Sequence, residues 1–216
     1  MIIFLSVFFV FFTLRNYKRF LFSHVPANKN YCLLIAHPDD ESMFFAPTLL
    51  NLKSKIHILC LSKGDTLFKW DYTRENELKS LCLDYNWDLT MYNLFDNEDW
   101  DIQVITNVLT YNCLINPFYI LITFDQCGVS GHKNHKSCYE AAKKFSQEFP
   151  IETMYLKSQN IFQKYFCNYL LGEREFILGF KDYFSVMKMM TYHRSQLLWF
   201  RYLYLIFSSY TSYNSY

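Results

Sequence analysis

The sequence predicts an α/β fold: a Rossmann-like three-layer domain with a mostly parallel sheet. Three observations point to this class. Short, continuous apolar runs such as 31–36 and 118–124 have the length and content of buried strands. Segments with apolar residues at helical spacing separate these runs, which is typical of a parallel sheet with helices on both faces. The length of 216 residues suits one domain with a substantial core.

In the first half of the chain, the expected strands are apolar runs and the expected helices carry apolar residues at helical spacing. The elements are a strand at 31–36, a helix at 42–53, a strand at 56–62, a helix at 72–85 and a strand at 89–95. We expect the first of these helices despite Pro47 in its first turns. Leu78, Leu81 and Cys82 lie on one side of the second helix.

The second half of the chain repeats this alternation before the pattern weakens. The elements are a helix at 101–114, a strand at 118–124, a helix at 136–149 and a short strand at 154–157. Val104, Ile105 and Val108 share one face of the first of these helices. Beyond Ser158 the pattern is less regular, and we expect one further helix, over 184–201.

Charge, cysteine usage and glycine content argue against several classes of protein. The formal net charge of +1 provides no basic footprint for nucleic acid. The seven cysteines are scattered, odd in number and form no C-x-x-C, which favours a reducing compartment over a disulfide framework. No glycine-rich phosphate loop follows any expected strand, which argues against a nucleotide-binding protein.

Both ends of the chain are hydrophobic. Residues 1–22 are mostly apolar with cations at 15–19, and we expect them to form a hydrophobic membrane anchor. The positive-inside rule then places residues 30–207 in the cytoplasm; an interfacial anchor or a dispensable leader is the alternative. Residues 197–207 suit either the headgroup boundary of a membrane or a helix docked on the core. Residues 208–216 are expected to be a tail.

A cluster of polar residues directly follows the first expected strand. The segment His37-Pro38-Asp39-Asp40-Glu41 places one imidazole and three carboxylates where a buried strand ends. Burying such a cluster without a partner is costly, and a divalent metal ion removes that cost. Because sites in open parallel sheets form outside the carboxyl ends of the strands, His132 and His135, which follow the strand at 118–124, are expected at the same edge.

The spacing within these two segments fits a metal site. His132 and His135 are three residues apart, so a helical turn would place both rings on one side. Asp39 and Asp40 point in different directions in an extended loop, so one can bind metal while the other faces the water. Two imidazoles and one carboxylate form a familiar zinc set, although other first-row ions accept the same donors. Such a set predicts hydrolysis of an amide or an ester.

These two motifs resemble the PIG-L family. The segments that carry the resemblance are Ala36–Glu41 and Gly128–His135, with further similarity at 43–48, 123–125 and 193–201. The resemblance implies that residues 30–207 form a zinc-dependent deacetylase domain, and that it acts on a glycolipid. The reaction would convert N-acetylglucosaminyl-phosphatidylinositol to glucosaminyl-phosphatidylinositol and acetate, in GPI-anchor biosynthesis. It would take place at the endoplasmic reticulum membrane, with the catalytic domain facing the cytoplasm.

The resemblance also implies roles for the polar residues of both motifs. His37, Asp40 and His135 would be the zinc ligands. Asp39 would be the general base and later the acid for the departing amine. His132 would stabilise the oxyanion.

Further residues match the family outside the metal set. Arg74 would contact substrate, and Asp99 corresponds to an acidic residue near the sugar; a solvated charge at the start of a helix is the alternative for Arg74. Glu41 would orient the loop or cap the following helix. Asp125 would be either a partner of a ligand histidine or a turn-forming residue. His193 has a family match without a role, as do the nearby Ser195 and Gln196.

Two other functions compete with the glycolipid reaction. One is deacetylation of a small soluble GlcNAc conjugate, and the hydrophobic ends of the chain argue against it. The other is a catalytically dead, membrane-attached glycolipid-binding module. The intact His37, Asp39, Asp40 and His135 argue against that reading. The expected partners are therefore the glycolipid and the membrane, and not nucleic acid.

Overall fold

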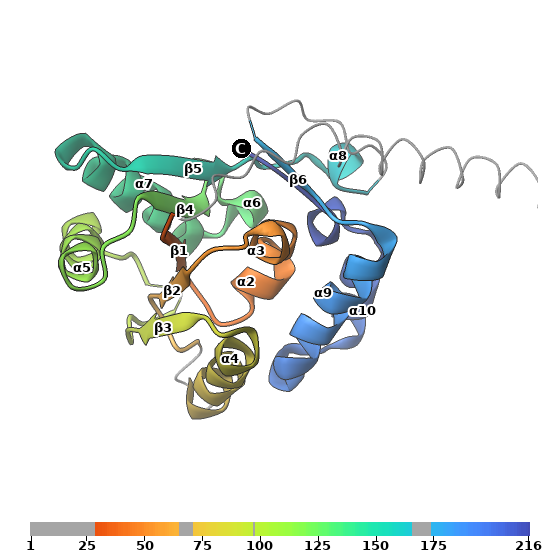
Figure 1. Ribbon diagram of the computed structural model, residues 1–216. Helices are drawn as coiled ribbons and strands as arrows, with labels where there is room; N and C mark the ends of the chain where they lie inside the picture. Colours follow the sequence, from red (N-terminus) through yellow and green to blue (C-terminus); the bar gives the residue numbers. More distant parts are fainter. Residues whose placement is uncertain (1–28, 65–70, 97, 166–173) are drawn as a thin grey trace, which may run out of the picture.

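Five parallel strands form the centre of the molecule in the computed structural model (Figure 1), which describes residues 29–64, 71–96, 98–165 and 174–216. In spatial order the strands are β3 (Asp88–Met91), β2 (Ile56–Cys60), β1 (Tyr31–Ile35), β4 (Ile120–Phe124) and β5 (Glu152–Leu156). Every neighbouring pair is parallel. The predicted α/β fold with a mostly parallel sheet is therefore confirmed.

The order of the strands reverses direction between β1 and β4. From β1 the chain first adds β2 and β3 on one side, and then β4 and β5 on the other. Loops that leave the carboxyl ends of β1 and β4 therefore diverge from a common point, which is where open α/β sheets place their sites. Residues 37–41 follow β1 and residues 125–135 follow β4, so topology alone brings the two motifs together.

Helices cover both faces of the sheet (Figure 1). On one side lie α5 (Ile102–Ile115) and α7 (Lys133–Glu148), with the short α6 (Gly128–Gly131) preceding α7. On the other side lie α2 (Asp40–Met43), α3 (Ala46–Asn51), α4 (Asp71–Tyr85) and α9 (Phe180–Tyr192). The remaining elements are α8 (Ile161–Tyr165), β6 (Glu175–Ile177), η1 (Arg194–Gln196), α10 (Trp199–Phe207), η2 (Ser209–Thr211) and β7 (Tyr213–Ser215).

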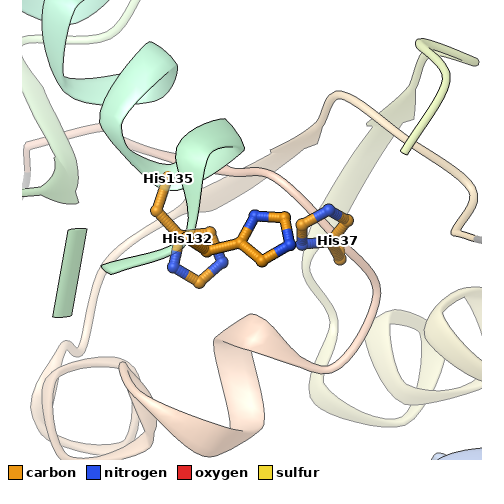
Figure 2. A group of neighbouring side chains, drawn as sticks. All are labelled: His37, His132 and His135. Carbon is orange, nitrogen blue, oxygen red and sulfur yellow. The ribbon is translucent and has the colours of Figure 1, made fainter. Parts of the chain in front are cut away.

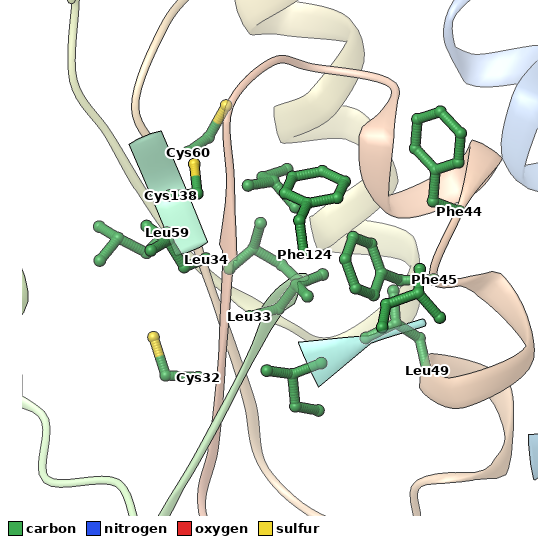
Figure 3. Packing of buried hydrophobic residues seen from close by; sticks show 14 of the residues in the cluster. Cys32, Leu33, Leu34, Phe44, Phe45, Leu49, Leu59, Cys60, Phe124 and Cys138 are labelled. Carbon is green, nitrogen blue, oxygen red and sulfur yellow. The ribbon is translucent and has the colours of Figure 1, made fainter. Parts of the chain in front are cut away.

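The core is formed by the apolar strands and the helices packed on them (Figure 3). β1, β2 and β4 are buried along their whole length, as their continuous apolar runs predict. Figure 3 shows Leu33 and Leu34 of β1 close to Phe124 of β4, with Phe45 and Leu49 beside them. The six cysteines in the described part of the chain are free thiols, so these segments carry no disulfide.

Two predicted helices are interrupted in the structure. The helix expected at 42–53 is split into α2 and α3, because Pro47 has no N–H and its ring would clash with the carbonyl of Met43 four residues earlier. The helix expected at 184–201 is also wrong. Its first part, α9, begins at Phe180 and ends at Tyr192, and α10 begins only at Trp199. His193 breaks the helix because its side chain enters the core.

The C-terminal segment completes a second, antiparallel sheet that the pattern of the sequence does not indicate. β6 pairs with β7, and Lys157 donates a backbone hydrogen bond to Ser215. The Asn214 side chain bonds the backbone and hydroxyl of Thr48 at 3.1 and 2.7 Å. Residues 208–216 are thus part of the folded domain rather than an appended tail.

The predicted membrane anchor at residues 1–22 lies outside the described residues. Within the described ranges, none of the helices has the length and apolarity needed to cross a bilayer.

Candidate active site

Three histidines converge where the loops after β1 and β4 meet. Figure 2 shows the rings of His37, His132 and His135 close to one another, and one nitrogen of each lies within 4.8 Å of the other two. His37 and His135 are buried and His132 is half-buried. Imidazole nitrogens at this mutual distance can share one divalent cation. The predicted convergence of the two motifs at one sheet edge is therefore confirmed.

Asp40 connects two of these rings. One carboxylate oxygen lies 3.2 Å from Nε2 of His135, and the other lies 3.7 Å from Nδ1 of His37. The second oxygen also accepts the backbone N–H groups of Ala36 and His37, at 3.2 and 2.9 Å. Burial by itself would raise the pKa of Asp40, but the charges and hydrogen bonds of His135 and His37 hold it well below its usual range. Asp40 is therefore ionised, and its carboxylate oxygens can bind a metal ion.

The orientation of His135 is set by an unusual turn after β4. Its Nδ1–H donates to the carbonyl of Gly128 at 3.0 Å, and its Nε2 lies 3.2 Å from Asp40. Burial by itself would lower the pKa of His135, but the charge and hydrogen bond of Asp40 raise it above its ordinary value. Gly128 has φ 66°, and a Cβ at this position would lie 3.0 Å from Cβ of His135. The next residue, Val129, has φ 57°, which is rare for a β-branched residue and costs about 1–3 kcal/mol. Its N–H is held by Ser158 at 2.8 Å.

Asp125 organises this turn. One of its carboxylate oxygens accepts the backbone N–H groups of Cys127 and Gly128 at 3.1 and 3.0 Å, and the other accepts that of Ser158 at 2.7 Å. Of the two roles considered for Asp125, the structure shows the turn-forming one. Asp125 acts on His135 through the Gly128 carbonyl.

His132 is the N-cap of α7, which determines where its proton lies. Its Nδ1 accepts the backbone N–H of Asn134 at 3.3 Å. Burial lowers the pKa of His132, and the nearby His37 and His135 lower it further. The neutral ring therefore carries its proton on Nε2 and offers a hydrogen-bond donor to the centre of the site.

Asp39 lies between two guanidinium groups. Its carboxylate is 3.6 Å from Arg74 and 3.1 Å from Arg201, and only 4% of the residue is exposed. Its backbone has φ 120°, a conformation that residues with a side chain rarely adopt. The backbone N–H donates to Glu41 at 3.1 Å. Glu41 holds the backbone of Asp39, and the two arginines hold its carboxylate. These contacts together fix the direction of the carboxylate.

Glu41 and His193 form a fully buried pair below this loop. They are joined by a hydrogen bond of 2.5 Å, and the same Glu41 oxygen accepts the Ser42 hydroxyl at 2.6 Å. Burial would raise the pKa of Glu41, but the charge of His193 lowers it below its ordinary value. Burial would conversely lower the pKa of His193, and Glu41 raises it. The pair is thus ionic, and it explains how Glu41 orients the loop.

Of the two residues predicted to contact substrate, Arg74 lies at the site and Asp99 does not. Arg74 is buried in the wall of the site and donates to the carbonyl of Pro38 at 2.7 Å. Asp99 has a side chain that is 96% exposed, and its partner is Lys133 at 3.3 Å. A third carboxylate at the site, besides Asp39 and Asp40, belongs to Asp96, which accepts from Nε2 of His37 at 2.8 Å.

Sequence reasoning assigned no role to Asp96 or Arg201. Asp96 follows β3, so the rule that sites form beyond the carboxyl ends of parallel strands could have identified it. Arg201 is the single charge within residues 197–207, an isolated cation in an apolar segment. A cation in such a segment needs an anionic partner if it is buried, so its presence could have indicated a contact with one of the carboxylates of the site.

The histidine cluster and the residues around it line one cleft of about 970 Å³. Its inner part contains the three histidines with Asp39, Asp40, Arg74 and Asp96. Its outer part is lined by α8 and α10, which contribute Lys164, Tyr165, Trp199, Phe200, Leu203 and Phe207. The cleft therefore has a polar reactive end and a largely apolar entrance.

Comparisons with known proteins agree on the class of protein. A family model described as PIG-L, GlcNAc-PI de-N-acetylase, matches residues 32–146. The N-acetylglucosaminyl-phosphatidylinositol de-N-acetylase of Bos taurus is 34% identical over 205 residues, which cover 85% of this chain and 81% of the bovine protein. A protein of Schizosaccharomyces pombe, named as a probable enzyme of the same kind, is 34% identical over 217 residues, covering 87% and 86%.

Solved structures with the same fold are more distant in sequence. A pseudoaglycone deacetylase superposes with a TM-score of 0.63 at 12% identity, over 80% of this chain and 84% of that one. At this identity the likeness concerns the fold alone.

Proposed function

This chain belongs to the PIG-L family, and on that basis we propose that it removes the acetyl group from N-acetylglucosaminyl-phosphatidylinositol. The products are glucosaminyl-phosphatidylinositol and acetate, in the biosynthesis of GPI anchors. One observation carries the proposal: Asp39, Asp40 and three imidazoles face one cleft, in a chain that resembles de-N-acetylases over most of its length.

The donor set suits zinc. His37, Asp40 and His135 would hold the ion: Asp40 lies 3.2 Å from Nε2 of His135 and 3.7 Å from Nδ1 of His37, and the Gly128 carbonyl orients the His135 ring. When bound, the ion polarises the amide carbonyl and lowers the pKa of water. Other divalent first-row ions accept the same donors.

The protein's own groups move the protons. Water adds to the carbonyl carbon of the acetamide, and Asp39 accepts the proton that this water loses. The Nε2–H of His132 donates a hydrogen bond to the oxyanion that forms on the former carbonyl oxygen. The carbon–nitrogen bond then breaks, Asp39 returns the proton to the departing amine, and acetate is released. The contacts of Asp39 with Arg74 and Arg201 orient its carboxylate for both transfers.

Substrate contacts follow from the walls of the cleft. Arg74 lies beside Asp39, where it can reach the sugar that carries the acetamide. We assign the acidic sugar contact to Asp96 in place of Asp99, because Asp96 lines the cleft.

The proposed location is the endoplasmic reticulum membrane, with the cleft facing the cytoplasm. The lipid tails of the substrate stay in the bilayer, so the cleft has to approach a membrane surface. The exposed aromatic and aliphatic side chains of α10, such as Trp199, Ile206 and Phe207, support this location. The anchor predicted at residues 1–22 would hold the domain there.

Acetate release from the purified glycolipid tests the function. We expect release with zinc, loss of release with a chelator and recovery when zinc is added back. Release at the same rate after complete removal of metal would contradict the proposed mechanism. Equal turnover of a lipid-free GlcNAc conjugate would favour a soluble substrate, and binding of the glycolipid without release would indicate a binding module.

A further inference from the structure

Lys164 brings an unusual cation into the cleft. It lies on α8, and its side chain lines the same cleft as the three histidines. The ammonium group lies 4.9 Å from the ring centre of Tyr204, 5.5 Å from that of Tyr165 and 6.0 Å from that of Tyr210. Aromatic faces attract a cation but do not neutralise it. Burial among these rings lowers the pKa of Lys164.

The other cations of the cleft have carboxylate partners. Arg74 and Arg201 both pair with Asp39, at 3.6 and 3.1 Å. No Asp or Glu in the described part of the chain lies within ion-pair distance of the Lys164 ammonium. A partly desolvated cation without such a partner costs free energy unless an anion joins it during function.

Lys164 is linked to the metal cluster by a row of rings. Its ammonium contacts Tyr204, whose ring lies 6.1 Å from that of Phe44, and the Phe44 ring lies 5.7 Å from that of His135. The cation and the reactive centre thus lie in one cleft, separated by two aromatic side chains. In the proposed substrate, the acetamide is on the sugar, and the one formal negative charge, the phosphodiester, is on the inositol joined to that sugar.

We propose that Lys164 binds the phosphodiester of the glycolipid while its acetamide lies at the His37–His132–His135 cluster. This inference rests on the proposed function and deepens it by assigning the subsite that recognises phosphate. A phosphate monoester on inositol offers the same oxygen acceptors, so the lipid is not required for this contact. Trp199, Leu203 and Phe207 line the cleft and would accommodate the apolar part of the glycolipid next to its phosphate.

Three substrates separate phosphate recognition from lipid recognition: GlcNAc-inositol, GlcNAc-inositol 1-phosphate and the complete glycolipid. We expect K164Q to lower kcat/KM for the two phosphate-bearing substrates by about 10- to 100-fold, the range of one charged hydrogen bond. Turnover of GlcNAc-inositol should not change. K164R should retain most of the preference for phosphate. K143Q is the matched control, because Lys143 also lies over a tyrosine ring, at 5.8 Å, but outside the cleft.

The outcomes distinguish this inference from the proposed function. Equal effects of K164Q on all three substrates, or no effect on any, would overturn the phosphate assignment. A loss confined to the complete glycolipid would also overturn it, and would indicate that Lys164 contacts the membrane. If the wild-type protein releases no acetate, the proposed function fails; calorimetric binding of glucosaminyl-inositol 1-phosphate to wild type and K164Q then decides the phosphate assignment by itself.

Discussion

Two regions of the chain form the active site, and different features of the fold bring each of them there. The sheet-edge half, residues 36–41 and 128–135, follows β1 and β4 and brings the metal cluster together through the topology of the sheet. The C-terminal half, residues 193–207, comes from outside the sheet and contacts the first half through His193–Glu41 and Arg201–Asp39. The first half carries the reacting groups, and the second holds the carboxylates in place.

This division predicts different consequences for substitutions in each half. Changes at the sheet edge should remove activity while the fold persists. Changes in the C-terminal half should cost stability or weaken catalysis through Asp39. Three substitutions, at Asp39, His193 and Arg201, test this contrast from the largest expected effect to the smallest, and a fourth, at His57, tests the sheet beside it.

Asp39→Asn tests the sheet-edge half. We expect kcat to fall by about 10²- to 10⁴-fold, the usual contribution of a general base, while the protein still folds and binds zinc. The free energy of unfolding should also fall, because Arg74 and Arg201 lose their charged partner. Acetate release, metal content and equilibrium unfolding measure the three properties. Full activity would refute the base assignment, and loss of metal would make Asp39 a ligand.

His193→Ala tests the C-terminal half. It leaves the Glu41 carboxylate buried without its ionic partner, which should lower the free energy of unfolding by about 3–5 kcal/mol. Urea unfolding measures this change. The double variant E41Q/H193Q should be more stable than His193→Ala, since neither buried charge remains. If His193→Ala unfolded like the wild type, the pair would not hold the C-terminal half to the loop.

Arg201→Met tests whether the C-terminal half acts on catalysis as well as on stability. The variant loses the contact that orients Asp39, so we expect kcat to fall by roughly 10-fold, with KM and metal content little changed. Arg194→Met is the control, because Arg194 is exposed and does not line the cleft. A rise in KM without a change in kcat would instead make Arg201 a substrate-binding residue.

His57 lies in β2, outside both halves, and tests the pH dependence of the sheet itself. Burial lowers its pKa, with a further lowering from Lys55 and an opposing effect of Asp88. Below pH 6.5, His57 therefore binds a proton more readily in the unfolded chain than in the folded protein. The contribution of His57 should make the folded protein less stable as the pH falls from 6.5 to the pKa of His57 in the folded state. His57→Gln should show a shallower loss of unfolding free energy in this range. An identical slope would exclude His57 as a source of acid sensitivity.

The sequence predicted the five parallel strands because their apolar runs are local signals. Boundaries were less accurate: the strand expected at 89–95 ends at Met91, and α7 begins at Lys133 instead of 136. This second difference matters chemically, since it makes His132 an N-cap and fixes its proton on Nε2. The family assignment from the two motifs is confirmed by the family model and the relatives.

The C-terminal region could not be predicted in the same way, because its order depends on distant partners. His193 interrupts a helical pattern for a contact with Glu41, 152 residues earlier in the chain. Asn214 bonds the carbonyl of Phe44 from 170 residues away. Helical periodicity over 184–201 contains no information about either contact.

The sequence alone determined which chemical groups are available and at which edge of the sheet they gather. Periodicity within a few residues specifies strands, and parallel strands deliver the residues after them to a common edge. Only the tertiary structure decided that Asp96 rather than Asp99 faces the cluster, that Arg201 holds Asp39, and that Lys164 enters the cleft. These outcomes depend on packing between segments far apart in the chain, where the free energy of a buried charge is set by its neighbours in space.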